Sequence, residues 1–94
     1  MLNTEYVGIF TSDSKVANKM LQTMEKYEND RWWLSDDPNY MAYKQFQEDT
    51  MLIESEAWQK ATESLLGRKV SFVEFRLNFN GLKNEVITKY LSKH

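Results

Sequence analysis

The side chains that could carry out chemistry in this chain of 94 residues are few and scattered. The single histidine is His94, the last residue, where a fraying chain end would not hold an imidazole against a nucleophile. The chain has no cysteine, which excludes thiolate catalysis and thiolate metal sites. Its three glycines are too widely separated to form a phosphate-binding loop. We therefore expect neither an enzyme nor a bound cofactor.

Carboxylates are the remaining candidates for metal binding. Asp36, Asp37, Glu48 and Asp49 match neither a calcium-loop nor a magnesium-site spacing, and the first two are better explained as helix caps. Asp49 together with Glu74-Phe75-Arg76 is similar to the acidic pair and basic residue of metal-dependent nucleases. Arginine stands there in place of the usual lysine, and it does not release its proton. We expect no metal site.

Length and composition indicate one compact domain over residues 1–94. A hydrophobic content of 41% can form a core, and no apolar run approaches the roughly 18 residues that span a bilayer. Glu5 stands where a signal peptide would carry positive charge, and the lack of cysteine fits a reducing cytosol. These features predict a cytoplasmic protein with no membrane partner.

Hydrophobic periodicity predicts an α+β fold of order β-α-α-β-α-β-α, with a small three-stranded sheet packed by three to four helices. The predicted strands cover residues 6–10, 51–53 and 69–77. The predicted helices begin at the caps Asp13, Asp37 and Ser55 and near Leu82, and the third ends at Gly67. The predicted core includes Trp58, Leu65, Phe72 and Ile87.

Three features could bind a partner. Arg31-Trp32-Trp33 has the composition of an interface hot spot, or else one tryptophan fills the core while the other lies half covered. Residues 28–63 carry nine acidic and three basic residues, a net charge of −6, and their tyrosines could help them to mimic a nucleic acid in a basic groove. The candidate partner-binding residues are Arg31, Trp32, Trp33, Asp36, Asp37, Tyr40, Tyr43 and Asp49.

The third feature is the basic C-terminal part, since residues 68–94 carry a net charge of +4. Arg68, Lys69 and Arg76 could contact phosphates. Glu74, Glu85 and the acidic remainder of the chain argue against nucleic-acid affinity at physiological salt.

A helix that contains Trp58 and ends Leu65-Leu66-Gly67-Arg68, followed by a strand that ends Glu74-Phe75, resembles small phage and prophage accessory proteins of unknown function. The chain departs from their pattern at Lys69, where proline is usual, and at Val73, where histidine is usual. The resemblance implies a phage protein that acts in the cytoplasm of a bacterial host. There it would inhibit a host protein with a basic surface, such as a defence nuclease. The alternatives are a nucleic-acid-binding regulator that uses the basic C-terminal part, and a structural subunit of a homo-oligomer.

Overall fold

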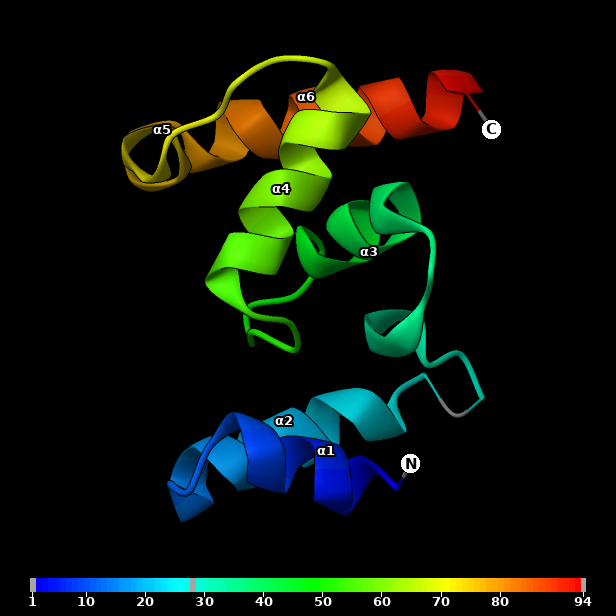
Figure 1. Cartoon of the computed structure of the whole chain (residues 1–94), viewed down its shortest axis with the longest axis vertical. Helices are drawn as coiled ribbons and strands as arrows, with labels where there is room; N and C mark the ends of the chain where they lie inside the picture. Colours follow the sequence, from blue (N-terminus) through cyan, green and yellow to red (C-terminus); the bar gives the residue numbers. More distant parts are fainter. Residues whose placement is uncertain (1, 28, 94) are drawn as a thin grey trace.

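The computed structural model describes residues 2–27 and 29–93, and its regular elements are all helical (Figure 1). In chain order they are α1 (Asn3–Phe10), α2 (Ser14–Glu25), the 3-10 helix η1 (Trp32–Leu34), α3 (Pro38–Gln45), α4 (Ser55–Leu66), α5 (Phe72–Leu77) and α6 (Phe79–Lys93). No residue in the described part of the chain belongs to a β strand. The predicted α+β class with a three-stranded sheet is therefore wrong.

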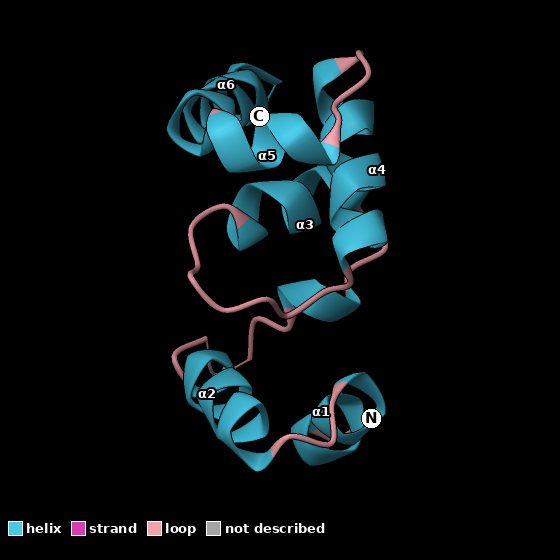
Figure 2. Cartoon of the chain, turned by 90° about the vertical axis from the view of Figure 1, so that its left-hand side faces the viewer, coloured by secondary structure: helices cyan, strands magenta, loops and turns pink. Residues whose placement is uncertain are grey.

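The helices lie in two layers along the longest axis of the molecule, whose dimensions are 34 × 28 × 18 Å (Figures 1 and 2). The helices α1 and α2 form one end, and α3 to α6 form the other. Between the two layers run η1 and the segment 46–54.

Each layer has its own hydrophobic cluster. The cluster near α1 and α2 contains the buried residues Val7, Met20, Met24, Trp32, Trp33, Leu52 and Ile53. The cluster among α3 to α6 contains the buried residues Phe46, Leu65, Val70, Leu82 and Val86. Trp58 on α4 packs against both clusters, and its ring centroid lies 4.7 Å from that of Phe46. One aromatic side chain therefore joins the two halves of the core.

The predicted core residues have different outcomes. Leu65 is fully buried, which confirms that prediction, whereas Trp58 and Ile87 are only partly buried. Phe72 is 46% exposed, so its prediction is wrong. The reason is that residues 72–77 form a helix, in which Phe75 turns inward against Trp58 and Phe72 turns outward.

The predicted helix signals in the sequence are mostly confirmed. The Asp13 carboxylate accepts from the backbone N–H of Lys15, and Asp37 accepts from that of Asn39, so both side chains cap helices. Gly67 ends α4 in the left-handed conformation, with φ of 70°. The predicted Ser55 cap is wrong by one residue: the N-cap is Glu54, and Ser55 is the first residue of α4.

The first predicted strand, residues 6–10, is the greater part of helix α1. A short apolar run fits either structure, because its length does not separate a period of 2 from one of 3.6. In α1, Tyr6 and Phe10 are four residues apart and share one helical face, and Val7 beside them is buried. That face packs on the first cluster and decides the conformation.

The second predicted strand, residues 51–53, is an extended loop without a neighbouring strand. Side chains take the place of that neighbour. The buried Gln45 amide accepts from Leu52 N–H at 2.8 Å and donates to Thr50 O at 2.9 Å, and the Tyr6 hydroxyl donates to Leu52 O. The backbone N–H and C=O of the buried Leu52 therefore both have partners without a neighbouring strand.

The third predicted strand, residues 69–77, divides into a buried loop residue and a short helix. The backbone N–H of Val70 donates to Glu63 at 2.9 Å, and its carbonyl accepts from Gln59 at 2.8 Å. Ser71 then caps α5 by accepting from Glu74 N–H at 3.2 Å. The alternation of large apolar residues suggested a strand, but the serine cap starts a helix at Phe72.

Candidate interaction surface

The structure places Trp32 and Trp33 inside the molecule, with 1% and 3% of their surfaces exposed. Their rings meet edge to face, with centroids 5.5 Å apart, and both also contact the Tyr27 ring. Arg31 before them is half buried and donates to the Asn3 side chain at 3.0 Å, which links η1 to α1. Both tryptophans therefore stabilise the first cluster and present no exposed aromatic face to a partner.

Asp49 also lies apart from the other predicted residues. It follows α3, whereas Asp36 and Asp37 precede it, and an eight-residue helix spans about 12 Å. The structure thus separates the predicted set of eight residues into a buried group, an isolated carboxylate and a group at the start of α3.

Tyr90 of α6, which was not among the predicted residues, also lies in the group at the start of α3. The Tyr43 and Tyr90 rings stack with centroids 4.2 Å apart and planes inclined by 13°. Tyr40 lies beside them, 6.1 Å from Tyr90. Tyr90 fits the apolar stripe of α6, and only the packing of α6 on α3 brings it to this place. We name this surface the tyrosine–aspartate patch, formed by Asp30, Asp36, Asp37, Tyr40, Tyr43 and Tyr90.

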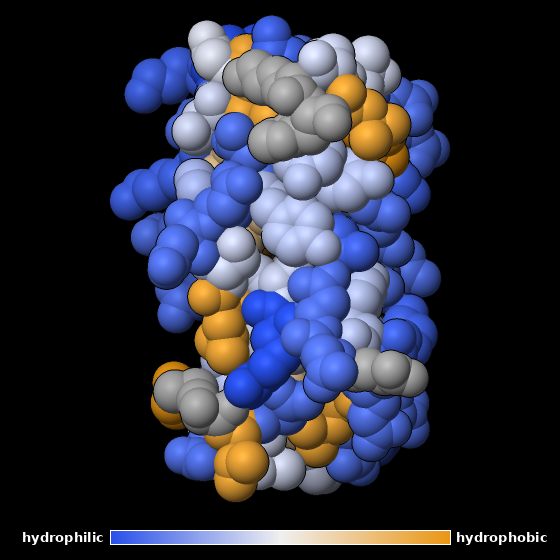
Figure 3. All heavy atoms as spheres, turned by 90° about the vertical axis from the view of Figure 1, so that its right-hand side faces the viewer, coloured by the Kyte–Doolittle hydropathy of each residue, from blue (hydrophilic) through white to orange (hydrophobic). Residues whose placement is uncertain are grey.

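The patch lies on the side of the molecule where α6 ends and where the segment before α3 passes (Figure 1). Figure 3 shows this side in space-filling form. Hydrophilic side chains dominate it, pale side chains of intermediate hydropathy lie among them, and apolar patches occur nearer the two ends. This side is therefore mostly hydrophilic.

One carboxylate of the patch is held within the fold. Asp30 accepts a hydrogen bond from the Tyr40 hydroxyl at 2.7 Å and lies 3.9 Å from the Lys44 ammonium. That ammonium also sits over the rings of Tyr27 and Tyr40, at 4.8 and 5.8 Å from their centroids. Lys44 thus neutralises Asp30 and orients the Tyr40 ring.

The two carboxylates before α3 face solvent. Asp36 and Asp37 are exposed, and Asp37 uses one carboxylate oxygen to cap the helix. The hydrogen bond to Asp30 and burial raise the pKa of Tyr40 to about 12, and burial with the nearby Asp37 charge raises the pKa of Tyr90. Tyr40 and Tyr90 are therefore neutral near pH 7, and the side chains of Asp36 and Asp37 supply the exposed negative charge of the patch.

Glu48, in the same acidic part of the sequence, pairs with other residues of the chain. It forms an ion pair with Lys26 at 2.9 Å and accepts from the Tyr27 hydroxyl. Burial and this hydrogen bond raise the pKa of Tyr27 well above its ordinary value. Glu48 thus ties the loop after α3 to the end of α2.

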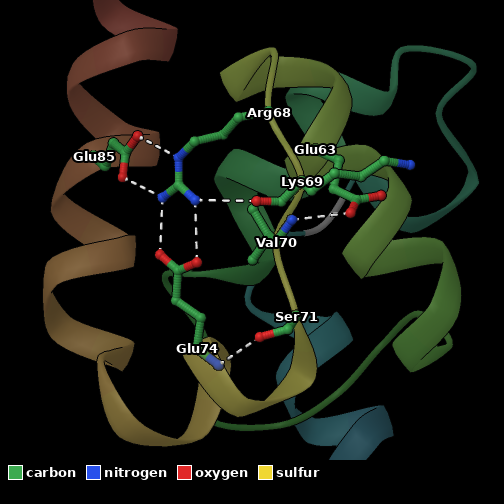
Figure 4. Close-up of polar contacts among 7 residues, drawn as sticks. All are labelled: Glu63, Arg68, Lys69, Val70, Ser71, Glu74 and Glu85. Atoms are coloured by element: carbon green, nitrogen blue, oxygen red, sulfur yellow. Dashed lines mark hydrogen bonds and ion pairs between the residues drawn. The ribbon is translucent and has the colours of Figure 1, made fainter.

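In the basic C-terminal part, Arg68 is held by two carboxylates (Figure 4). Its guanidinium donates to both oxygens of Glu74 at 3.0 and 2.8 Å and to both oxygens of Glu85 at 3.1 and 2.7 Å. It also donates to the Lys69 carbonyl at 3.2 Å. The arginine lowers the pKa of both carboxyl groups and joins the end of α4 to α5 and α6.

We call these contacts of Arg68 with Glu74 and Glu85 the Arg68 clamp. They bear on the alternative hypothesis that the basic C-terminal part binds a nucleic acid. Arg68 has its guanidinium donors engaged, so its charge is already balanced inside the fold. Lys69 and Arg76 are exposed and form no ion pair with any described carboxylate. The predicted phosphate-binding set thus loses its central arginine.

Comparison of the chain with family models, curated proteins and solved structures gives no match. Across residues 2–27 and 29–93, no three histidine or acidic side chains are grouped as a metal site would need. In the same part of the chain, no helix is both long and apolar enough to cross a membrane.

Proposed function

We propose that this protein is a non-enzymatic accessory protein that binds another protein through the tyrosine–aspartate patch and covers a basic surface on it. In line with the resemblance to phage and prophage proteins, its place of action is the cytoplasm of a bacterial host. Its target there is a host protein, such as a defence nuclease, and the result is inhibition.

The observation that supports this proposal is the stack of Tyr43 on Tyr90 beside the exposed Asp36 and Asp37. Tyrosine gives a large contact area at a small cost in side-chain entropy, and stacked rings are already ordered before binding. Exposed carboxylates attract a basic partner and raise the rate of encounter. Rings beside carboxylates also offer the two surfaces of a nucleic-acid strand, bases and phosphates, to a protein groove that binds one.

The proposal is tested by affinity capture from bacterial lysate, comparing patch variants with a matched control. Asp36→Asn with Asp37→Asn removes two charges, and asparagine retains the ability to cap α3. Glu5→Gln with Glu25→Gln removes two exposed charges from α1 and α2. We expect the patch pair to lose the captured protein and the control pair to retain it. Equal capture by the wild type, the patch pair and the control pair would rule out the patch as the binding surface.

A further inference from the structure

An apolar hollow lies between α1, η1 and the start of α4. Five residues line it, Tyr6, Ile9, Phe10, Leu34 and Glu54, and its volume is about 340 Å³. Its floor is fixed, because the Tyr6 hydroxyl donates to Leu52 O and the Tyr6 ring stacks on Phe10 at 6.4 Å. Ile9 on its edge is 77% exposed, and Glu54 is the only ionised side chain of its lining. An apolar cavity with one carboxylate suits an apolar side chain that has a cation beside it.

The outward face of α5 has that composition. Phe72, Val73 and Leu77 are exposed there, Leu77 at 83%, and Arg76 lies among them. The helix is held from behind, since Phe75 contacts Trp58 with ring centroids 4.7 Å apart and Glu74 binds Arg68. Leu77 thus projects from a fixed base, and exposed apolar groups clustered in this way mark an interaction site.

The hollow and the α5 face are separated along the longest axis of the molecule, because the hollow lies between α1 and the segments that connect the two layers, whereas α5 belongs to the other layer. The helices α1 and α5 are in different layers along the longest axis in both views (Figures 1 and 2). One copy of the chain therefore cannot bring its own two surfaces together, but two copies can.

We propose that copies of this chain associate head to tail, with the α5 face of one copy seated in the α1–η1 hollow of the next. Leu77 fills the hollow, and Arg76 pairs with Glu54 at its edge. Because the two surfaces differ, the contact is heterologous, and an open assembly keeps one free hollow at one end and one free α5 face at the other.

Charge favours a second copy in this arrangement over a symmetric dimer. Two α5 faces placed together would oppose Arg76 to Arg76, and two hollows would oppose Glu54 to Glu54. Head-to-tail contact instead pairs opposite charges.

This inference goes beyond the proposed function and is independent of it, because no residue of the tyrosine–aspartate patch belongs to either surface. The patch remains accessible in a head-to-tail assembly by this criterion. A substitution that abolishes self-association therefore leaves partner binding to be measured, and a substitution that abolishes partner binding leaves self-association to be measured.

Sedimentation velocity over a concentration series tests the association. We expect the average mass of the wild-type protein to rise with concentration past that of a dimer, and to fall when salt is added. Leu77→Asp should weaken association by at least about tenfold, as loss of a central apolar side chain does. The matched control is Leu91→Asp. Leu91 is also an exposed leucine but lies on α6, so this variant should associate like the wild type.

A charge exchange tests the register. Glu54→Arg and Arg76→Glu should each abolish association when alone. A mixture of the two variants should associate again, because the altered hollow accepts the altered α5 face and the unaltered surfaces accept one another. Circular dichroism of each variant verifies that these exposed substitutions leave the helices intact.

Four results would overturn the inference. They are a wild-type protein that stays monomeric at every concentration, a mass that stops at the dimer, equal loss of association in Leu77→Asp and Leu91→Asp, and a charge mixture that does not associate. Phosphatidylglycerol vesicles that bind the monomer in a Leu77-dependent way would assign the α5 face to a lipid surface instead.

Discussion

At the scale of single residues, the acidic side chains divide into two kinds. Some are paired with a cation or a hydroxyl of the same chain, as Glu74 and Glu85 are with Arg68 at the surface. Others, such as Asp36 and Asp37, face solvent. The difference matters for binding because only exposed, unbalanced charge steers a partner from a distance.

The Arg68 clamp predicts a defined dependence of stability on acid. In the folded protein, the pKa values of Glu74 and Glu85 lie below the ordinary 4.5. Above pH 4.5 both carboxyl groups are therefore ionised in the folded and in the unfolded chain, and the clamp contributes its full stabilisation. As pH falls below 4.5, the unfolded chain takes up protons first, and the stabilisation is lost as pH passes the folded pKa values. We expect Arg68→Gln to lower the melting temperature at neutral pH and to converge with the wild type in acid. Lys69→Gln is the control, and a constant difference across the pH range would contradict the prediction.

The half-buried, hydrogen-bonded hydroxyls of Tyr27 and Tyr40 predict a loss of stability in alkali. The pKa values of Tyr27 and Tyr40 are raised above 10.0 in the folded protein. Stability is complete below 10.0 and decreases above it, since the unfolded tyrosines then release protons that the folded ones retain. The double variant Tyr27→Phe, Tyr40→Phe should lose less stability between neutral pH and pH values above 10.0, measured by urea unfolding. An equal loss of unfolding free energy in both proteins would show that these hydroxyls do not control the loss of stability in alkali.

At the scale of elements, the sequence predicted helices at the places of α2, α3, α4 and α6, where apolar residues recur at helical spacing after a polar or turn-forming residue. It did not predict that segments 51–53 and 69–71 stay outside any sheet. Their backbone groups are bonded by the distant side chains of Gln45, Gln59 and Glu63, and no local pattern reveals such partners.

The same limit applies to the candidate site. Local composition indicated Tyr40, Tyr43 and the neighbouring aspartates, because acidic and aromatic residues alternate there. It could not indicate Tyr90, which reaches the patch only through the contact of α6 with α3. Composition alone also could not decide that both Trp32 and Trp33 are buried.

The loop bonded by Gln45 gives a direct test of the helical fold. Gln45→Ala removes both hydrogen bonds to residues 50 and 52 and leaves the buried N–H of Leu52 and the half-buried C=O of Thr50 without that partner. We expect the free energy of unfolding to fall by roughly 2–4 kcal/mol, the cost of two such groups. Gln22→Ala, at an exposed position of α2, should change it by less than about 0.5 kcal/mol. Similar values for both variants would show that Gln45 does not hold the loop.

At the scale of the whole molecule, two layers with separate clusters share the Trp58 side chain. Because so small a chain has little stability to spare, we expect this shared contact to help the two layers unfold cooperatively. The tyrosine–aspartate patch and the two surfaces proposed for self-association are formed by different residues of this frame.

Trp58→Ala tests the shared core. We expect it to cost about 3 kcal/mol, the lower part of the range for large aromatic residues in cores, since Trp58 is only partly buried. Thermal unfolding followed by far-ultraviolet circular dichroism should show one transition in the wild type and an earlier one in the variant. An unchanged melting temperature would mean that the two clusters are stable without their bridge.

The most direct test of the proposed binding surface is the association rate with the captured partner, measured by stopped flow at increasing salt. Steering by Asp36 and Asp37 predicts that the Asp36→Asn, Asp37→Asn pair associates more slowly than the wild type and depends less on salt. The Glu5→Gln, Glu25→Gln pair should keep the wild-type rate and salt slope. If both pairs behave like the wild type, while Lys83→Gln with Lys89→Gln slows association, the partner binds the basic C-terminal part and the tyrosine–aspartate patch is not the interaction surface.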